Sequence, residues 1–207
     1  MQRQNGWPVT EWQGNIRRAS TTDAAVVTGI LAEAFMRDPV SGWIFPADDH
    51  RARVHPAFFG PFVALALRTG EVHVAGDGLG ATLWLPVGDD HGADEGDEFA
   101  ELEATIGPDA MKRFGMLDEQ MSANHPAEPH WYLPFIAVHP AHHGKGVGSA
   151  LLRDKLTELD RAGTAAYLEA SSARNAALYE RLGFRRRPTT LDLPDGPSLY
   201  PMWREPA

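Results

Sequence analysis

The chain has 207 residues, of which 43% are hydrophobic, a size and composition that fit one globular domain carrying a long insertion. It contains no cysteine, which excludes disulfides, a thiolate nucleophile and cysteine-ligated metal sites. Its formal net charge is −9, and its basic cluster at residues 185–187 is interpreted as a solvated strand end, so we expect no nucleic-acid binding. Apolar runs of membrane-spanning length and a signal-peptide pattern are both missing, so we expect a cytoplasmic protein that does not bind membranes.

The N-terminal part predicts a tail, a strand and a helix. Residues 1–15 are read as a tail ahead of a single domain over 16–207, whose first strand is expected at 16–19. A helix follows over 20–36, because several residues that favour helix N-caps precede its apolar positions. It should end before Pro39, since the residue before a proline disfavours helical geometry.

Residues 40–49 are predicted to be a turn-rich loop that carries Trp43 and Phe45. Two roles suit such large apolar side chains, and the sequence does not separate them: a lid over the core, or one wall of an acceptor pocket. A second helix is expected over 50–68, where two internal prolines would kink or split it.

A hairpin and an acidic segment follow. An Asp-Gly pair at 77–78 is a strong turn signal between strands expected at 71–75 and 79–85, and Pro86 should end the second strand. The acidic insertion at 87–98 indicates a solvated loop, or else a patch of carboxylates that attracts a cationic amine. Further elements are expected as helices at 99–106, 109–123 and 174–182, a strand at 165–170, and a closing hairpin of 185–193 and 198–204.

The most informative stretch is 131–163. An apolar segment of strand length meets a glycine-rich turn, HGKGVG, and the turn opens a helix whose apolar residues recur at helical spacing. Gly163 lies where a left-handed helix cap is expected. Together with the other elements, this predicts an α/β (mixed α+β) fold with a twisted mixed sheet and helices on both faces.

The turn has the chemistry of an anion site. Its glycines allow the backbone to curl and to approach a ligand closely, and the N–H groups and dipole of a helix start attract phosphate. Lys145 adds a full positive charge, although an ordinary tight turn would need the same glycines. A P-loop requires Ser or Thr after the lysine, and the dinucleotide fingerprint requires G-x-G-x-x-G, so neither of these phosphate sites matches.

A second pattern, YLEASSARNAALYERLGF, begins at Tyr167. Asn175 and Tyr179 are four residues apart within it, so they share one helix face. A tyrosine at this position suits either a core aromatic or a group that acts on a ligand.

Taken together, the two stretches resemble the GNAT superfamily of N-acetyltransferases. His143, Gly146 and Gly148 match its pyrophosphate loop, Arg/Gln-x-x-Gly-x-Gly/Ala, except that histidine replaces Arg or Gln. Asn175 and Tyr179 match its second acetyl-CoA motif. The resemblance implies a GNAT-like sheet of about seven strands and direct transfer of an acetyl group from acetyl-CoA to an amine.

The resemblance also assigns roles to individual residues. Tyr179 would protonate the leaving thiolate, since a phenol with a pKa near ~10 stays protonated at neutral pH, and Asn175 would hold the pantetheine or pyrophosphate arm. The expected acetyl-CoA contacts are Phe135, Ile136, Ala137, Val138, His143, Gly144, Lys145, Gly146, Val147, Gly148, Ser149, Asn175 and Tyr179.

Glu169, near the end of its predicted strand, is the candidate base that accepts the proton of the amine. The competing interpretation is a structural carboxylate paired with Arg174 or Lys145. With no cysteine present, a covalent acetyl-thiol intermediate is excluded. The expected acceptor pocket comprises Trp43, Phe45, Trp84 and Glu169.

Four histidines, at 130, 139, 142 and 143, raise the question of a metal site. Zinc needs three or four converging ligands, and we interpret these side chains as surface histidines and expect no metal. The expected partners are acetyl-CoA and a small-molecule amine, a class that includes antibiotics. Two alternatives stay open, a non-catalytic acyl-CoA sensor and a peptide or protein N-acetyltransferase. The oligomeric state is also open, with a homodimer among the options.

Overall fold

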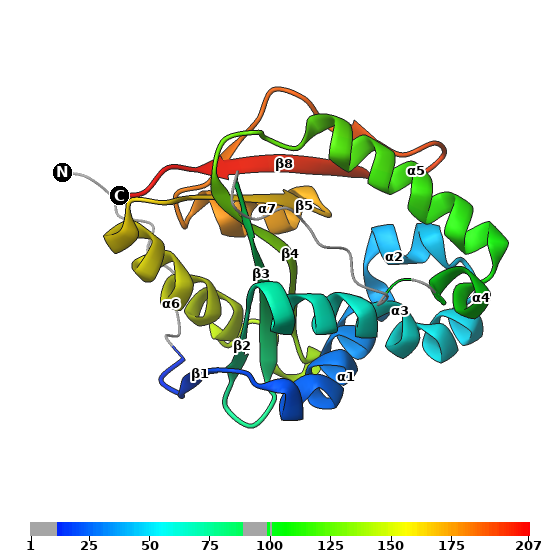
Figure 1. Cartoon of the computed structure of the whole chain (residues 1–207), viewed down its shortest axis with the longest axis horizontal. Coiled ribbons are helices and arrows are strands. Elements are labelled where there is room, and N and C mark those ends of the chain that lie inside the picture. The colour runs from blue at the N-terminus through cyan, green and yellow to red at the C-terminus, as the bar shows by residue number, and fades with distance from the viewer. Residues whose placement is uncertain (1–11, 89–98, 100) are drawn as a thin grey trace.

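The computed structural model describes residues 12–88, 99 and 101–207. Most of the expected tail (1–15) and nearly all of the acidic insertion (87–98) therefore lie outside the described residues. The described chain has a mixed α/β fold, in which an eight-stranded mixed sheet carries helices on both faces (Figure 1). This confirms the predicted fold class.

The sheet has the strand order β1-β2-β3-β4-β5-β8-β6, with β7 paired to β8. β4 and β5 run parallel, and the other described pairs are antiparallel. The strands are β1 (Ile16–Arg18), β2 (Glu71–Ala75), β3 (Gly80–Val87), β4 (His130–Val138), β5 (Ala165–Ala170), β6 (Arg185–Arg186), β7 (Leu191–Asp192) and β8 (Ser198–Arg204).

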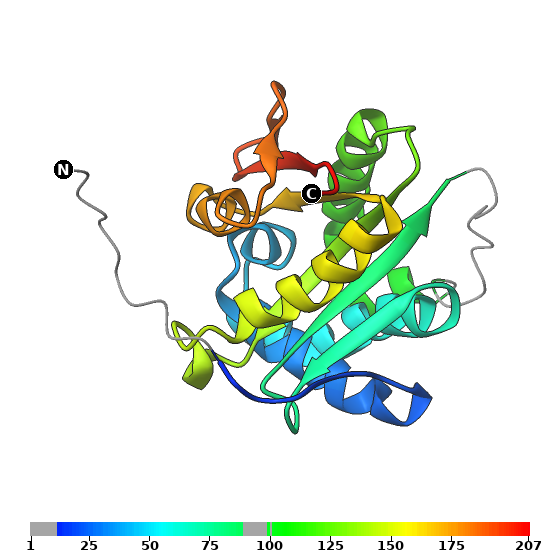
Figure 2. The same cartoon turned by 90° about the vertical axis from the view of Figure 1, so that its left-hand side faces the viewer.

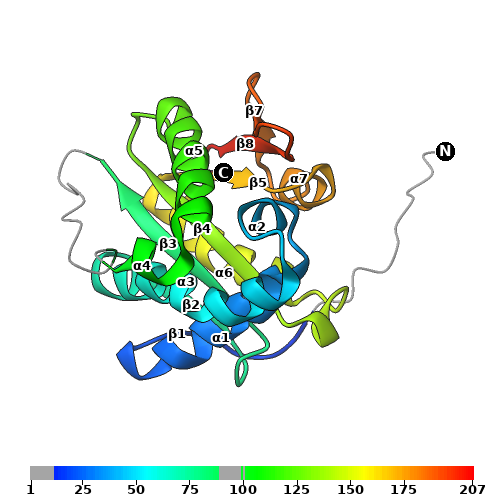
Figure 3. The ribbon, with the colours of Figure 1, turned by 90° about the vertical axis from the view of Figure 1, so that its right-hand side faces the viewer.

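Helices α6 and α7 cover one face of the sheet (Figure 2), and α1, α2, α3 and α5 lie on the other (Figure 3). The helices are α1 (Ala24–Ala34), α2 (Pro39–Ile44), α3 (Asp48–Thr69), α4 (Leu102–Ile106), α5 (Pro108–Asn124), α6 (Val147–Ala162) and α7 (Ala173–Glu180), with 3-10 turns at Thr21–Asp23, Phe35–Arg37 and Pro140–His142. Within the described ranges, none of these helices is long and apolar enough to cross a membrane.

A hydrophobic core lies on each face of the sheet. On the α1 and α3 face, the rings of Phe59 and Phe62 pack edge-on against Phe135 of β4, with centroids 5.4 and 5.1 Å apart. On the other face, apolar residues of α6 pack with Leu133 of β4 and Leu168 of β5. Because successive side chains of a strand point to opposite faces, β4 contributes to both cores.

The segment 40–49 is largely helical, so its prediction as a turn-rich loop is wrong. Oδ1 of Asp38 accepts hydrogen bonds from the N–H groups of Val40 and Ser41 at 2.9 and 3.1 Å, and Pro39 occupies the first turn of α2. An aspartate N-cap followed by proline is a favourable helix start. The first helix ends before Pro39, as predicted, and the Asp38-Pro39 pair also begins a second helix.

The effect of Pro86 was predicted wrongly, and the two prolines of α3 do not split it. β3 continues past Pro86 to Val87, with Pro86 opposite Trp131 of β4. The pairing of β3 with β2 has already ended at Trp84, so one edge of β3 is free where proline lacks its N–H group. α3 is a single helix that contains both of its internal prolines.

β4 and β5 pair over only three residues and then part. Their parallel register stops at Tyr132 and Tyr167, although both strands continue. On the other side of β4, the register with β3 shifts between Leu83 and Leu85, so that β4 carries one extra residue there. Such a bulge bends a strand, and Pro134 within it has no N–H group to continue a ladder. Beyond this point β4 keeps β3 on one edge and leaves the other edge open.

Candidate active site

The loop between β4 and α6 is shaped by two glycines in left-handed conformation. Gly144 has a φ of +74° and Gly146 a φ of +84°, and Gly146 immediately precedes the first residue of α6. Residues with a Cβ adopt this region at a cost, which explains glycine at both positions. A Cβ on Gly148 would lie 3.4 Å from Cγ2 of Val138, so the helix start packs closely on the end of β4.

The start of α6 presents free backbone donors. The first bond of the helix runs from the N–H of Ala150 to the carbonyl of Gly146. Across the described residues, the N–H groups of Val147, Gly148 and Ser149 have no acceptor. A helix N-terminus with unpaired N–H groups and a favourable dipole is a site for a phosphate or another anion. Lys145, which is exposed, stands beside it.

His143 ties this loop to the end of β4. Its Nε2 donates a hydrogen bond of 2.8 Å to the carbonyl oxygen of Val138. The side chain at the position where the family pattern has Arg or Gln therefore fixes the loop against the strand. It also occupies one of the backbone groups of β4 that were expected to bind pantetheine.

A chain of hydrogen bonds links α7 to α2. Nδ2 of Asn175 donates to Oγ of Ser171 at 3.2 Å, and Ser171 Oγ donates to Oδ2 of Asp38 at 2.6 Å. Ser172 caps α7 by accepting the N–H of Asn175 at 3.2 Å. Asp38 is also the N-cap of α2, so one carboxylate connects the two helices that flank the open end of the sheet (Figure 3).

Tyr179 lies in the core that α6 and α7 form with the sheet. It is 6% exposed, and its ring packs against Phe184 with centroids 5.9 Å apart. Leu133 of β4 belongs to the same cluster, which places the tyrosine near the parting of β4 and β5. Burial raises the pKa of Tyr179, and the negative charge of Asp38 raises it further, so the phenol is protonated at neutral pH.

Glu169 is a buried carboxylate with a raised pKa. Its side chain is 3% exposed, and burial raises its pKa to about 7, against the opposing effect of the adjacent phenols of Tyr132 and Tyr167. Among the described residues, Glu169 Oε1 and the Tyr167 hydroxyl have no hydrogen-bond partner, and neither Arg174 nor Lys145 forms an ion pair with Glu169. The structural pairing with those two residues is therefore not supported.

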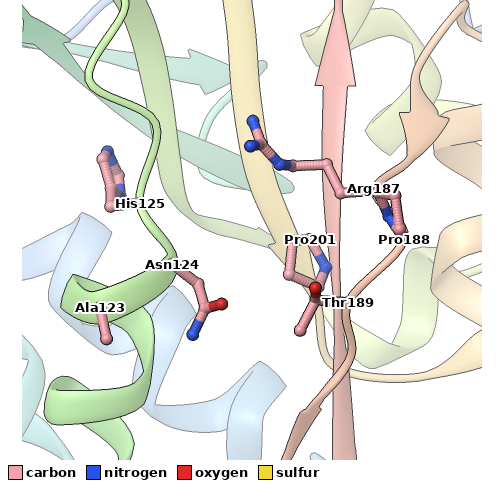
Figure 4. Close-up of a pocket in the computed structure, with 7 residues that line it drawn as sticks. All are labelled: Ala123, Asn124, His125, Arg187, Pro188, Thr189 and Pro201. Carbon is pink, nitrogen blue, oxygen red and sulfur yellow. The ribbon is translucent and has the colours of Figure 1, made fainter.

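His125 stands between Glu169 and an open cavity. Its Nδ1 lies 4.0 Å from Oε1 of Glu169, and burial lowers its pKa to about 4, so the ring is neutral at pH 7. The cavity has a volume of about 420 Å³ and is lined by His125, Asn124, Arg187 and Pro201, among others (Figure 4). Pro201 is the cross-strand partner of Glu169, so the cavity lies next to that position of β5.

The predicted pocket residues do not converge. Phe45 and Trp84 have no exposed surface and belong to the cores on opposite faces of the sheet, so neither lines the cavity. Trp43 is half-buried and its Nε1 donates to the carbonyl of Pro194 at 2.9 Å, which fixes α2 to the turn before β8. None of the four predicted pocket residues lines the cavity, but Glu169 lies 4.0 Å from the lining residue His125.

Sequence reasoning missed several polar residues of this region. Asp38 and Ser171 were given no role in the site, and Arg187 was interpreted as part of a solvated strand end. A polar residue directly after a strand, such as Ser171, was a usable sequence signal for a residue of the site. In the described part of the chain, no three or more His, Asp or Glu side chains lie together as a metal site would require. His130, which was expected at the surface, is buried.

Comparisons with known proteins fit this geometry. The family described as Acetyltransferase (GNAT) domain matches residues 111–186, which include β4, the glycine loop, α6, β5 and α7. A crystal structure of histone acetyltransferase HPA2 and related acetyltransferase from Corynebacterium glutamicum is 31% identical, with a TM-score of 0.71 over 94% of this chain and 97% of that chain. The chain belongs to the GNAT acetyltransferase family. It is therefore an acyltransferase of the N-acetyl type, and enzymes of this family use acetyl-CoA.

More distant structures share the fold. Arylalkylamine N-acetyltransferase 2 from Aedes aegypti is 15% identical, with a TM-score of 0.65 over 94% of this chain and 100% of that chain. The polyamine N-acetyltransferase of Drosophila melanogaster, an enzyme that forms N-acetylagmatine, is 16% identical, with a TM-score of 0.59 over 92% and 99%. At such identities the likeness extends to the fold alone.

The proposed anion site in the glycine loop can be tested by comparing the glycines at the two ends of α6. Gly146 and Gly163 bound α6 at its two ends, and both are left-handed, with φ of +84° and +65°. Replacing either by alanine should cost about 1 kcal/mol of stability. Gly146→Ala should in addition weaken CoA binding, measured by calorimetry, by about tenfold, because strain there displaces the N–H donors. Equal CoA affinities for Gly146→Ala and Gly163→Ala would contradict a binding role for this loop.

Proposed function

We propose that the chain transfers the acetyl group of acetyl-CoA directly to the amine of a small molecule. The observation that carries this proposal is the pairing of Glu169, whose buried carboxylate has a pKa of about 7, with Tyr179, whose phenol stays protonated. The two groups lie on β5 and on α7, which directly follows it, beside the parting of β4 and β5. A proton acceptor and a proton donor on either side of one reaction centre suit acyl transfer to an amine.

The chain offers a fitting place for acetyl-CoA. The unpaired N–H groups at 147–149, with Lys145 beside them, would hold the diphosphate. The open edge of β4 would hold the pantetheine arm as an added strand. Because the carbonyl of Val138 already accepts a hydrogen bond from His143, the arm would pair with backbone groups of Phe135, Ile136 and Ala137. Asn175, held by Ser171, would orient the arm from α7.

Glu169 would act as the base. An amine that arrives protonated must lose a proton before its lone pair can attack the thioester carbonyl, and a carboxylate with a pKa of about 7 accepts protons efficiently near neutral pH. The amine nitrogen then forms the new C–N bond while the C–S bond breaks. Neutral His125, 4.0 Å from the carboxylate, leaves the charge of Glu169 uncompensated and available to the amine.

Tyr179 would act as the acid. The leaving sulfur carries the electron pair of the broken C–S bond, and the phenol would supply the proton that converts it to a thiol. The carboxylate of Asp38 opposes ionisation of the phenol before that moment and is itself held by Ser171 and the start of α2. Asp38 would thus position and tune Tyr179 without contacting the acceptor.

A small-molecule acceptor is supported by resemblance and by the site. The stretches HGKGVGSALL, YLEASSARNAALYERLGF and LPDGPSLYPMWR resemble puromycin N-acetyltransferase, so an aminated antibiotic such as puromycin is a first candidate acceptor. A cavity of about 420 Å³ suits a compact molecule. Short peptides are the second candidate class. Thiol release from acetyl-CoA should be measured with puromycin, arylalkylamines, agmatine and short peptides. CoA binding without turnover of any amine would favour the acyl-CoA sensor.

Replacing the proposed acid should separate catalysis from binding. Tyr179→Phe should lower kcat by about 10²-fold or more, the usual loss for a missing general acid, while the KM for acetyl-CoA changes little. Tyr200→Phe provides the control, because that tyrosine is half-buried beneath Arg186 and lies outside the proposed site. An unchanged kcat for Tyr179→Phe would show that Tyr179 contributes to packing and not to catalysis.

The raised pKa of Glu169 predicts two opposite pH effects. Activity requires the ionised carboxylate, so kcat/KM should rise with pH through about 7. The free energy of unfolding should fall as the pH rises from 4.5, the ordinary pKa of a glutamate, to about 7, the pKa of Glu169 in the folded state. The reason is that the folded state holds this proton more tightly than the unfolded chain does.

Glu169→Gln should abolish the rise of kcat/KM with pH and should lower kcat. It should also raise the melting temperature at pH 8 relative to the wild type. Glu119→Gln, on the exposed side of α5, is the matched control and should change neither profile. A Glu169→Gln enzyme that retains the wild-type pH profile would show that another group accepts the proton.

A further inference from the structure

We propose that the cavity beside Glu169 is an anion-binding subsite, in which Arg187 holds a carboxylate of the acceptor. The preferred acceptors would then be amines that also carry a carboxylate. This inference rests on the proposed function, because it assigns the acceptor class of the same site. It concerns a residue that lies outside the glycine loop and outside the tyrosine helix.

The backbone fixes Arg187 at the cavity. Its N–H donates to the carbonyl of Pro201 at 2.8 Å, and Pro201 is paired across the sheet with Glu169. Figure 4 shows the Arg187 side chain extending from the strand end toward β5, away from Pro188 and Thr189. Burial raises the pKa of Tyr167 and lowers the pKa of His125, and the guanidinium charge of Arg187 acts to lower both, as expected for a side chain that extends toward these two neighbours of Glu169.

Arg187 differs from nearby arginines in having no anionic partner. Arg186 forms an ion pair with Glu180 at 2.7 Å, and Arg204 binds Asp160 through two hydrogen bonds of 2.7 and 2.8 Å. Within the described ranges, no carboxylate pairs with Arg187. A guanidinium with free donors that faces a cavity is suited to bind a carboxylate in the bidentate geometry that arginine favours.

The remaining polar groups of the cavity favour an anion over a cation. Asn124 offers an amide N–H and Thr189 a hydroxyl, and Figure 4 shows both at the cavity wall. His125 is neutral, since its pKa is lowered to about 4, and adds no opposing charge. Glu169 lies on the far side of His125, so the site has a proton acceptor at one end and a cation at the other.

This polarity matches a molecule with an amine at one end and a carboxylate at the other. The amine would lie toward Glu169 and the thioester, and the carboxylate toward Arg187. An acceptor with a second cationic group in place of the carboxylate would be repelled by the guanidinium. The cavity would therefore select against the polyamine type of substrate that the Drosophila melanogaster enzyme is named for.

The test compares amines that differ only by a carboxylate: tryptamine with tryptophan, and tyramine with tyrosine. Thiol release from acetyl-CoA gives kcat/KM for each, and the measured quantity is the acid-to-amine ratio within a pair. We expect a ratio above one for the wild type. Arg187→Gln should lower that ratio by about tenfold or more, the typical effect of losing a charge-assisted bidentate contact.

Arg185→Gln is the matched control, because it removes the same charge from an exposed arginine two residues away that does not line the cavity. Its ratio should stay within about twofold of the wild type. A wild-type ratio below one, or a ratio that Arg187→Gln leaves unchanged, overturns the subsite while the acetyltransferase proposal stands. If the wild type acetylates neither these compounds nor any amine of the wider panel, the proposed function itself fails.

Discussion

The parting of β4 and β5 is the structural constraint on which the rest of the site depends. Three pairs of residues hold the strands parallel, and then a bulge with Pro134 bends β4 away from its neighbour. Backbone N–H and C=O groups that would pair in an uninterrupted sheet are left along one edge of β4, and unpaired backbone groups are expensive to bury without a partner. A ligand that can pair with them, as we propose for a pantetheine arm, is thereby favoured. The glycine loop, α7 and Glu169 all surround this opening.

Electrostatics around the opening separate two protonation tasks. Burial raises the pKa of Glu169 toward neutrality against the opposing effect of the adjacent phenols, whereas burial and, secondarily, a nearby negative charge keep the phenol of Tyr179 protonated. The charge in question is Asp38, which also caps α2 and accepts a hydrogen bond from Ser171. One buried carboxylate thus couples the helix that flanks the acceptor face to the helix that carries the proposed acid. Arg187 supplies a positive charge in the separate cavity next to His125.

Local patterns predicted much of this structure, and long-range packing accounts for what they missed. The strand 165–170 was predicted with its observed bounds, because a short apolar run between a helix cap and a pair of serines has few alternatives. The glycine loop was recognised because left-handed geometry demands glycine. The pKa of Glu169 depends on Tyr132 and other residues brought in by the fold, which no local pattern shows. Likewise, the cavity joins α5 to the chain beyond β6, so residue types near Arg187 gave no sign of it.

A crystal structure of the chain with CoA would test the central claim most directly. The account predicts the diphosphate against the backbone N–H groups of 147–149, the pantetheine arm along the open edge of β4, and the thiol within hydrogen-bond reach of the Tyr179 hydroxyl. Such a complex would show that the coenzyme binds where β4 and β5 separate. CoA bound elsewhere on the molecule, with the glycine loop and the strand edge unoccupied, would contradict the account.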